Sequence, residues 1–433
     1  MITDKENKIL ASIDENKEEV IEYLKQLISF RTITPPFEKT EEEENRDEYK
    51  KFQELICRKL ENMNFDIEKW EIEPSKLEQA PGFGVLPDRD LSDLPVVVGK
   101  LKGVGKGRSL ILNGHYDVVS PGEIENWRHD PFKGVIEDNK MYGRGTCDMK
   151  GGIAAMLKAV EFIQRAGVKL NGDITIESVP DEEGSLMGTL ACCQKGYKAD
   201  AAIIPEPTSM NTLVAMRGYL AGKITIPGRA GHAEVKQPHW KEGGAVNAIH
   251  KTVKIIRALE ELTEEWSNRP DTQHKLLDPN HIVPTVIRGG KWAISYPEKV
   301  ELEFTSNFIP QTEYILKEIE TKIMRVAETD PWLKENPPTI ETFWAYGGEI
   351  DENEPIAQTA MTAAGDLGIT SRPAGMGSLT DGVHLINYSK VPTISVGPSG
   401  KTAHAANEFV DIDELINITK VLALMILRWC GHR

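Results

Sequence analysis

The chain lacks three features that mark whole classes of protein. Its 433 residues include five cysteines with no Cys-x-x-Cys pair, which argues against a disulfide framework and a thiolate zinc site. No hydrophobic run approaches the ~20 residues that a helix needs to cross a bilayer. Basic residues are scarce, because 51 lysines and arginines stand against 67 acidic residues, a net charge of -16. Such acidity argues against a nucleic-acid partner, whose binding surface would be basic.

The first residues also lack a targeting signal. Residues 1–19 are polar and acidic, unlike a secretory or mitochondrial leader, so we expect a cytoplasmic protein with no membrane partner. A hydrophobic content of 40% over this length is ample for two or three domains with cores of their own.

The order of the apolar patterns predicts an α/β fold. Expected strands and helices alternate along the first half of the chain, which implies a largely parallel sheet with covering helices. The expected strands are residues 66–71, 96–102, 109–113, 173–179 and 201–204. The expected helices are residues 17–30, a second one that begins with the acidic run at 41–45 and continues to about 64, 151–166, and one after 181–184. Ligands of such sheets bind beyond the carboxyl ends of the strands.

The pattern changes near Arg217 and changes back later. Strands expected at 219–227, 281–288 and 300–307, with helices at 244–266 and 312–328, make an α+β unit of their own. Residues 339–345, 355–367 and 392–395 then resume the α/β pattern, and 412–429 form a last helix. We therefore expect a catalytic domain of residues 1–216 and 336–433, interrupted by an inserted domain of residues 217–335.

Residues 110–160 hold the strongest chemical motif. An apolar run ends in His115 and Asp117, and a glycine-flanked turn later places Asp148 just before a glycine pair and a helical pattern. A histidine at a strand end and a carboxylate at a strand-to-helix turn can share a metal ion. Taken singly, the first pair also fits a surface hydrogen bond, and Asp148 also fits a helix N-cap.

Further acids and a histidine follow later strands. Glu182 and Glu183 come after the strand that ends at Val179, and Glu206 comes after the next short apolar strand. His404 lies among small residues before the last helix. The paired acids also fit favourable helix-start charges, and an acid between prolines also fits a plain turn.

Together these segments resemble a known family. NGHYD, GRGTCDMKGG, PDEEGS, IPEPT and SGKTAHAANEF are similar to segments of the co-catalytic zinc hydrolases that include acetylornithine deacetylase, succinyl-diaminopimelate desuccinylase, aminoacylase and glutamate carboxypeptidase. The resemblance implies a mostly parallel-sheet zinc-hydrolase catalytic domain with an inserted α+β dimerisation (lid) domain. It implies two divalent metal ions, zinc first with cobalt or manganese as substitutes. The implied ligands are His115, Asp148 as the bridge, Glu183, Glu206 and His404.

The resemblance assigns three more residues to the reaction. Glu182 is expected to take a proton from the attacking water and pass it to the departing amine. The Asp117 carboxylate is expected to accept the second imidazole N–H of His115 and fix its tautomer. His232, in the insert, is similar to the histidine that supplies an oxyanion donor from a partner subunit, which predicts a homodimer. A surface-loop histidine is the alternative for His232.

Three other features keep two interpretations each. Glu408 is either a partner of the metal ligands or an exposed acid at a helix start. Cys147 is either a buried filler or a reactive thiol beside Asp148. The segment from Gly375 to His384 resembles the family's substrate-side glycine loop and also fits a plain connection.

The expected activity is hydrolysis of a small-molecule N-acyl substrate, most like that of acetylornithine deacetylase. Desuccinylase, aminoacylase, dipeptidase or deformylase activity would use the same site, whereas an inactive binding relative would lack a ligand or the base, and none is missing. At the end of the insert's last strand, where many relatives carry an arginine for a substrate carboxylate, this chain has Asn307. Arg288, Arg372 and Lys401 are the other cations considered for that role.

Overall fold

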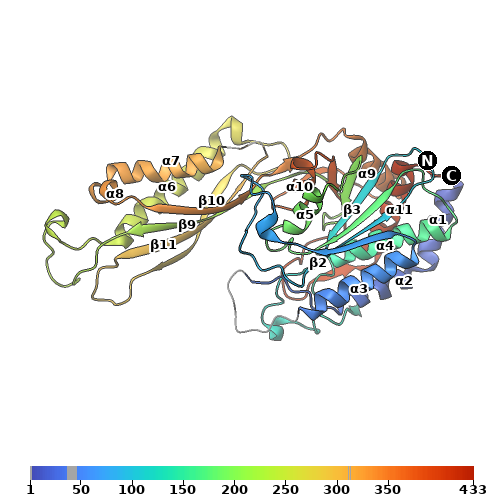
Figure 1. The fold of residues 1–433 in the computed structure, drawn as a ribbon, viewed down its shortest axis with the longest axis horizontal. Coiled ribbons are helices and arrows are strands. Elements are labelled where there is room, and N and C mark those ends of the chain that lie inside the picture. The colour runs from blue at the N-terminus through green and yellow to red at the C-terminus, as the bar shows by residue number, and fades with distance from the viewer. Residues whose placement is uncertain (1, 37–45, 311, 313) are drawn as a thin grey trace.

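The computed structural model describes residues 2–36, 46–310, 312 and 314–433 (Figure 1). It confirms the α/β class, with a central sheet that is largely parallel. The acidic run at residues 41–45, expected on the second helix, lies outside the described residues. Within the described part of the chain, no helix is both long enough and apolar enough to span a membrane.

The larger of two parts contains the central sheet and its helices. The strands of this sheet are β1 (Asp66–Glu71), β2 (Pro95–Leu101), β3 (Leu110–His115), β6 (Ile174–Val179), β7 (Ala201–Ile204), β8 (Thr212–Met216), β13 (Gly348–Glu349), β14 (Pro373–Met376) and β15 (Thr393–Ser395). Its helices are α1 (Asp4–Glu15), α2 (Lys17–Ile28), α3 (Asp47–Asn62), α4 (Lys150–Arg165), α5 (Met187–Lys195), α9 (Pro355–Asp366), α10 (Gly382–Asn387) and α11 (Ile412–Cys430).

The strand order brings the ends of distant segments together. The order is β1-β2-β6-β3-β7-β15-β8-β13, with β14 also paired to β8. The neighbours β6, β3, β7 and β15 run parallel, while β1 and β2 are antiparallel additions at one side. Because parallel strands point the same way, the segments that follow these four strands all emerge at one edge of the sheet.

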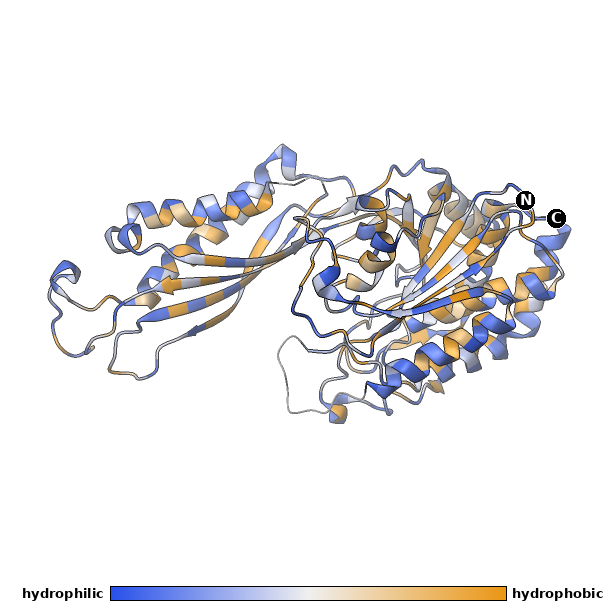
Figure 2. Ribbon diagram, viewed as in Figure 1, coloured by the Kyte–Doolittle hydropathy of each residue, from blue (hydrophilic) through white to orange (hydrophobic). Residues whose placement is uncertain are grey.

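Alternation along β3 separates the two covering layers. Leu110 and Leu112 pack in the large core with residues of α4 and α11, whereas Ile111 packs on the opposite face with residues of α5 and α10. All three side chains are fully buried, and burying a side chain of this size stabilises a fold by about 1.5–3 kcal/mol. Figure 2 shows the central strands as mostly hydrophobic and the outer helices as mixed.

The smaller part has its own sheet and core, and it extends from one side of the larger part in Figure 1. Its strands are β9 (Gly218–Pro227), β10 (His281–Gly289), β11 (Lys299–Phe308) and β12 (Thr339–Ala345), in the order β10-β11-β9-β12. Its helices are α6 (Ala248–Asn268), α7 (Ile315–Thr329) and α8 (Pro331–Glu335). Alternate residues of β9 and β11 are buried, and the hydrophobic ones among them pack with α6 and α7.

The expectation that residues 339–345 resume the central sheet is wrong. They form β12, which pairs with β9 along its whole length. Alternation predicts which residues of a strand share a face, but it does not say which sheet the strand joins. The expected domain boundaries stay a prediction, and the position of β12 argues for moving the end of the insert to about residue 345.

A third, small sheet links two loops of the larger part. It consists of β16 (Phe409–Asp411), β5 (Lys140–Tyr142) and β4 (Val135–Glu137) in that order. Phe409 pairs with Tyr142, so the segment before β16 is fixed beside the turn that follows β5. That turn leads to Asp148, and the segment before β16 contains His404 and Glu408.

Candidate metal centre and active site

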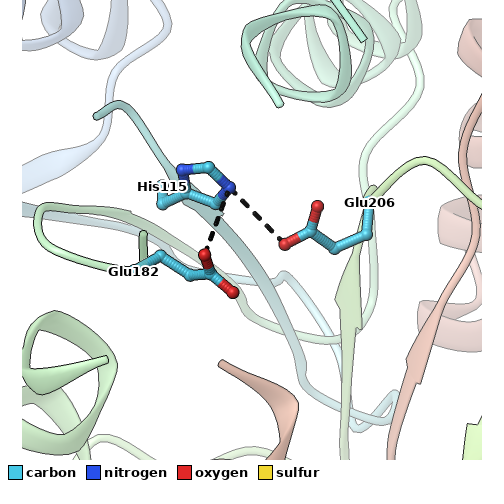
Figure 3. A group of neighbouring side chains, drawn as sticks. All are labelled: His115, Glu182 and Glu206. Carbon is cyan, nitrogen blue, oxygen red and sulfur yellow. Dashed lines mark ion pairs between the residues drawn. The ribbon is translucent and has the colours of Figure 1, made fainter. Parts of the chain in front are cut away.

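His115 lies at the carboxyl end of β3 and is completely buried. Its Nε2 lies 3.3 Å from Asp148 Oδ1, 3.6 Å from Glu206 Oε1 and 3.9 Å from Glu182 Oε2. Figure 3 shows the two glutamates approaching this nitrogen from different sides. Among the described residues the nitrogen has no hydrogen-bond partner. A buried, unpartnered imidazole nitrogen facing three carboxylates fits a metal ion well.

His404 forms the second half of the cluster. Its Nε2 lies 3.0 Å from Glu183 Oε2 and 3.5 Å from Asp148 Oδ2. Asp148 therefore faces one histidine with each of its two oxygens, as a carboxylate shared by two metal ions would. Ligand atoms of His115, Asp148 and Glu183 all lie within 4.8 Å of one another, as do those of His115, Glu182 and Glu206. The donor set of imidazole and carboxylate suits Zn²⁺ and similar ions.

Asp148 lies just before α4, and the other ligand candidates lie at or beyond the ends of parallel strands of the central sheet. Glu182 and Glu183 come three and four residues after the end of β6, Glu206 comes two residues after β7, and His404 lies in the segment that follows β15. The common edge of the four parallel strands is thus what gathers residues that are almost 300 positions apart.

Glu408 holds the turn that carries Asp148. Its Oε1 accepts the backbone N–H groups of Cys147 (3.0 Å) and Asp148 (3.3 Å). Its Oε2 accepts the N–H of Gly145 (3.1 Å) and the buried guanidinium of Arg144 (2.5 Å). Glu408 is fully buried, so the exposed-acid interpretation is wrong and its carboxylate orients a candidate bridging ligand.

The glycine pair after Asp148 permits a close approach of two segments. A Cβ at Gly152 would lie 2.1 Å from the carbonyl oxygen of Pro205, and one at Gly151 would lie 2.3 Å from that of Thr146. Because Pro205 precedes Glu206, the start of α4 presses directly against the backbone that presents another ligand candidate. The two glycines therefore allow the ligand candidates Asp148 and Glu206 to lie close together.

Asp117 differs from its expected role. The nearest acceptor to His115 Nδ1 is the backbone carbonyl oxygen of Asp117 at 3.0 Å, while its carboxylate oxygen lies at 3.6 Å. The carboxylate instead accepts the backbone N–H groups of Glu182 and Glu183, both at 3.2 Å, and the Thr34 hydroxyl at 2.7 Å. Asp117 thus fixes the tautomer mainly through its backbone and fixes the Glu182–Glu183 turn through its side chain.

The charges of the cluster depend on one another. Burial raises the pKa of Glu182, Glu183 and Glu206, and the neighbouring acids raise it further. Burial acts in the same direction on Asp148, but the two imidazoles outweigh it and hold the pKa below its usual range. Contact with Asp148 and Glu183 raises the pKa of His404 to about 10. Divalent ions at this cluster would favour the ionised form of these buried acids.

A cavity of about 650 Å³ opens onto the cluster. It is bounded by parts of both sheets and by the loop between Gly375 and His384, whose Met376, Ser378, Leu379 and Thr380 contribute to its wall. The remaining lining residues are Leu86, Asp148, Glu182, Glu183, Gly184, Leu186, Glu206, Tyr219, Ala221, Asn307, Phe343 and His404. Over the described residues, no lysine or arginine lines it. Because four residues of the segment from Gly375 to His384 line the cavity, the structure favours the glycine-loop interpretation over a plain connection.

The three candidate cations for a substrate carboxylate lie elsewhere. Arg288 forms an ion pair with Glu303 on the neighbouring strand, and neither Arg372 nor Lys401 contributes to the cavity wall. His232 is exposed in the segment between β9 and α6 and is also absent from the wall, so its role from a partner subunit stays a prediction.

A sequence model of peptidase family M20/M25/M40 matches residues 111–428. The chain belongs to this family. It is therefore a metal-dependent hydrolase that acts on amide bonds. This confirms the resemblance drawn from the motifs. The number and identity of the metal ions, and the role of each ligand candidate, belong to the proposals below.

Two relatives cover nearly the whole chain of this M20 enzyme. N-formyl-4-amino-5-aminomethyl-2-methylpyrimidine deformylase of Bacillus subtilis is 32% identical, with 97% of each chain covered. The enzyme of the same name from Halalkalibacterium halodurans is 31% identical, with 98% of each covered. These relatives are deformylases, one of the alternatives from the sequence, rather than acetylornithine deacetylases.

Solved structures share the fold at low identity. Human carnosine dipeptidase 1 superposes with a TM-score of 0.74 at 14% identity, covering 99% of this chain and 100% of that one. A tripeptidase from Staphylococcus aureus gives 0.72 at 19% identity, covering 95% and 98%. Both agree with the mixed α/β architecture and the second, smaller sheet.

Two buried residues near the site were missed by the sequence reasoning. No sequence pattern indicated a role for Arg144, because its ion pair is with Glu408, more than 260 positions later in the chain. Asp381 precedes α10, and burial raises its pKa to about 8. The sequence feature that could have indicated Asp381 is its position in the segment from Gly375 to His384, which resembles the family's glycine loop. Cys147, by contrast, is the buried filler that was expected, since burial raises the pKa of its thiol and leaves it unexposed.

Proposed function

We propose that this M20 enzyme removes the formyl group of N-formyl-4-amino-5-aminomethyl-2-methylpyrimidine, releasing formate and the free aminomethylpyrimidine. The absence of a lysine or arginine from the described wall of the cavity carries this proposal. Acetylornithine, succinyl-diaminopimelate, acyl amino acids and dipeptides all bring a carboxylate that must be neutralised where it is buried. A formylated aminopyrimidine is neutral, and both relatives, which the chain covers almost completely, are named as deformylases of this compound.

We propose two divalent ions, zinc by preference, at the site. One would be held by His115, Asp148 and Glu206, and the other by Asp148, Glu183 and His404. When bound, such ions supply Lewis acidity that lowers the pKa of a water molecule and polarises an amide carbonyl.

Glu182 is the residue that moves the proton. It borders the cavity, its carboxylate lies 3.9 Å from His115 Nε2, and burial raises its pKa well above the usual range. A base with a raised pKa can accept a proton from the attacking water and return it to the amine nitrogen as the formamide C–N bond breaks. Formate takes up the water oxygen, and the aminomethyl group leaves with the proton.

The active unit in this proposal is a homodimer. Val283 and Ile287 on the edge strand β10 and Ile249 and Val253 on α6 are exposed hydrophobic residues of the smaller part. Apolar side chains along an open strand edge and a neighbouring helix favour association with a second copy. A partner subunit would bring a His232 to the site as an oxyanion donor.

The test is hydrolysis by zinc-loaded protein, followed as release of the free amine from every substrate and as release of formate from the pyrimidine. The panel contains the formylated aminopyrimidine, acetylornithine and a dipeptide, each with and without chelator. We expect chelator-sensitive turnover of the formylated pyrimidine alone. Glu182→Gln should lower kcat by about 10²- to 10⁴-fold with metal content unchanged, while Glu123→Gln on the exposed surface should leave it intact. Turnover of acetylornithine without formate release from the pyrimidine would contradict the proposal.

A further inference from the structure

One face of the smaller sheet changes character at the end that meets the cavity. The face opposite α6 and α7 carries charged side chains along most of its length, including the ion pair between Lys223 and Glu341 at 3.1 Å. Toward the cavity the same face carries Tyr219, Ala221, Asn307 and Phe343, and all four line the cavity. The uncharged end of this face is therefore a wall built for a neutral ligand.

Asn307 is the only residue of that end with a carboxamide. It lies on β11 directly opposite Tyr219 of β9, so the two side chains are cross-strand neighbours about 5 Å apart at Cβ. Within the described part of the chain, neither the Asn307 carboxamide nor the Tyr219 hydroxyl has a hydrogen bond to another residue. Asn307 is half-buried, so its amide has lost part of its water without gaining a protein partner.

A carboxamide and a cation recognise different ligands at this position. An arginine at this position would present only N–H donors and would match a carboxylate. A carboxamide presents one acceptor and one donor side by side. That pair complements a ring nitrogen next to an amino group, as when asparagine or glutamine binds the amino group and ring nitrogen of adenine.

We propose that Asn307 recognises the amino group and adjacent ring nitrogen of a 4-aminopyrimidine substrate through two hydrogen bonds, and that Tyr219 and Phe343 provide the aromatic wall for its ring. Asn307 is then the residue that sets specificity for the amine half of the substrate, away from Glu182. The inference rests on the proposed deformylase function and deepens it. Asn307 thereby suits an aminopyrimidine edge where an arginine would suit a carboxylate.

The experiment compares two formamides that differ only at the ring. One is the formylated 4-aminopyrimidine, and the other carries hydrogen in place of the 4-amino group. For the wild-type enzyme we expect kcat/KM for formate release to favour the amino compound by about 10- to 100-fold. Asn307→Leu should raise KM for the amino compound and bring the ratio close to one, with turnover of the unsubstituted compound retained.

Two further variants separate recognition from folding. Asn307→Asp has the same shape and keeps an acceptor for the amino group, but it lacks the N–H donor for the ring nitrogen that both compounds share. It should therefore raise KM for both compounds and keep much of the preference. Thr305→Val lies two residues earlier on the same face, outside the cavity, and should keep the wild-type ratio. A preference that survives in Asn307→Leu overturns the proposal, and so does a wild-type KM for both compounds in Asn307→Asp, which would leave the Asn307 amide without a bond to the ring nitrogen.

The wild-type result distinguishes the two proposals. Formate released from both compounds at equal kcat/KM would leave the deformylase function standing and overturn the role of Asn307. Formate released from neither compound would overturn both.

Discussion

Glu408 is a buried carboxylate that touches no predicted metal-ligand side chain and yet determines how one of them is presented. It accepts three backbone N–H groups from the turn at Gly145, Cys147 and Asp148 and pairs with the buried Arg144. Backbone N–H groups that point inward around an anion keep the turn from relaxing toward solvent. The position of Asp148 is therefore coupled to the charge of Glu408.

Replacing Glu408 by glutamine should weaken metal binding. Glu408→Gln keeps the size but removes the charge, which leaves Arg144 buried without a counter-charge and loosens the turn at Asp148. We expect metal affinity to fall by about 10- to 100-fold, measured by competition with a chromophoric chelator. Asp413→Asn, an exposed charge removal nearby on α11, is the control. Unchanged affinity in Glu408→Gln would show that the turn keeps its shape without the anion.

At the residue scale, the side chains of the site were more predictable from the sequence than their hydrogen-bond partners. His115, Asp148, Glu183, Glu206 and His404 could be found because each comes shortly after a strand or before a helix, and the structure brings all five together. The roles of Asp117 and Glu408 could not be assigned, because they depend on backbone N–H and C=O groups that no residue pattern displays. Hydrogen bonds to the backbone require the folded loop.

At the scale of elements, the close contact of α4 with the segment after β7 predicts an unusual effect of alanine. Alanine in a helix is normally more stable than glycine by about 1 kcal/mol. Gly152→Ala should nonetheless destabilise the protein and lower metal affinity, since its Cβ would meet backbone 2.1 Å away. Gly365→Ala in α9, where nothing lies within 4 Å, should stabilise by about 0.5 kcal/mol. Melting temperatures of the two variants should move in opposite directions.

Asp330 lies between α7 and α8 and connects both to α6 in the smaller part. It caps α8 by accepting the N–H groups of Trp332 and Leu333 at 3.0 and 3.1 Å, and it pairs with Lys251 and Lys254 of α6. Burial alone would raise the pKa of Asp330, but the two ammonium groups and the backbone N–H groups outweigh it and leave the pKa lowered. A carboxylate with a lowered pKa stabilises the fold only while it is ionised.

This gives Asp330 a pH-dependent contribution. The pKa of Asp330 is lower in the folded protein than in the unfolded chain. Its carboxylate therefore stabilises the fold fully above about pH 4, near the unfolded pKa, and this stabilisation is lost as the pH falls below that value. Asp330→Asn, which keeps a capping oxygen, should lower stability by about 1 kcal/mol at pH 7, and Asp330→Ala by about 2 kcal/mol. Thermal unfolding should show the difference between wild type and Asp330→Asn shrinking from pH 7 to pH 3. A constant difference would rule out the charge as its source.

The helices and strands themselves were largely predictable. Apolar patterns gave β3, β6, α4 and α11 to within a few residues, and the more polar β1 was also predicted at its observed bounds. The first helix, α1, was missed because its composition is polar, although Thr3 and Glu6 form a capping box that marks its start. Glu6 also pairs with Arg428 near the other end of the chain, a contact that local sequence does not indicate.

At the scale of the whole molecule, the substrate cavity belongs to neither part alone. Its metal-facing wall comes from the larger part, and Tyr219, Asn307 and Phe343 come from the smaller sheet. The sequence pointed to Asn307 in place of an arginine, but it could not show that no lysine or arginine of the described residues lines the cavity. Whether Arg288, Arg372 or Lys401 lines the cavity depends on the tertiary structure. Their absence from the wall is what favours a substrate without a carboxylate.

Variants of His232 test the proposal that a partner subunit completes the active site. It is exposed and lies outside the cavity wall of its own chain, so a catalytic role requires the partner's cavity. Homodimers of His232→Ala and of Glu182→Gln should each be nearly inactive. In a heterodimer of the two, one site would carry both substitutions and the other neither. Random mixing should therefore restore about a quarter of wild-type formate release. Mixed dimers confirmed by mass but without recovered activity would place the histidine at the cavity of its own chain, and activity of His232→Ala alone would place it outside the reaction.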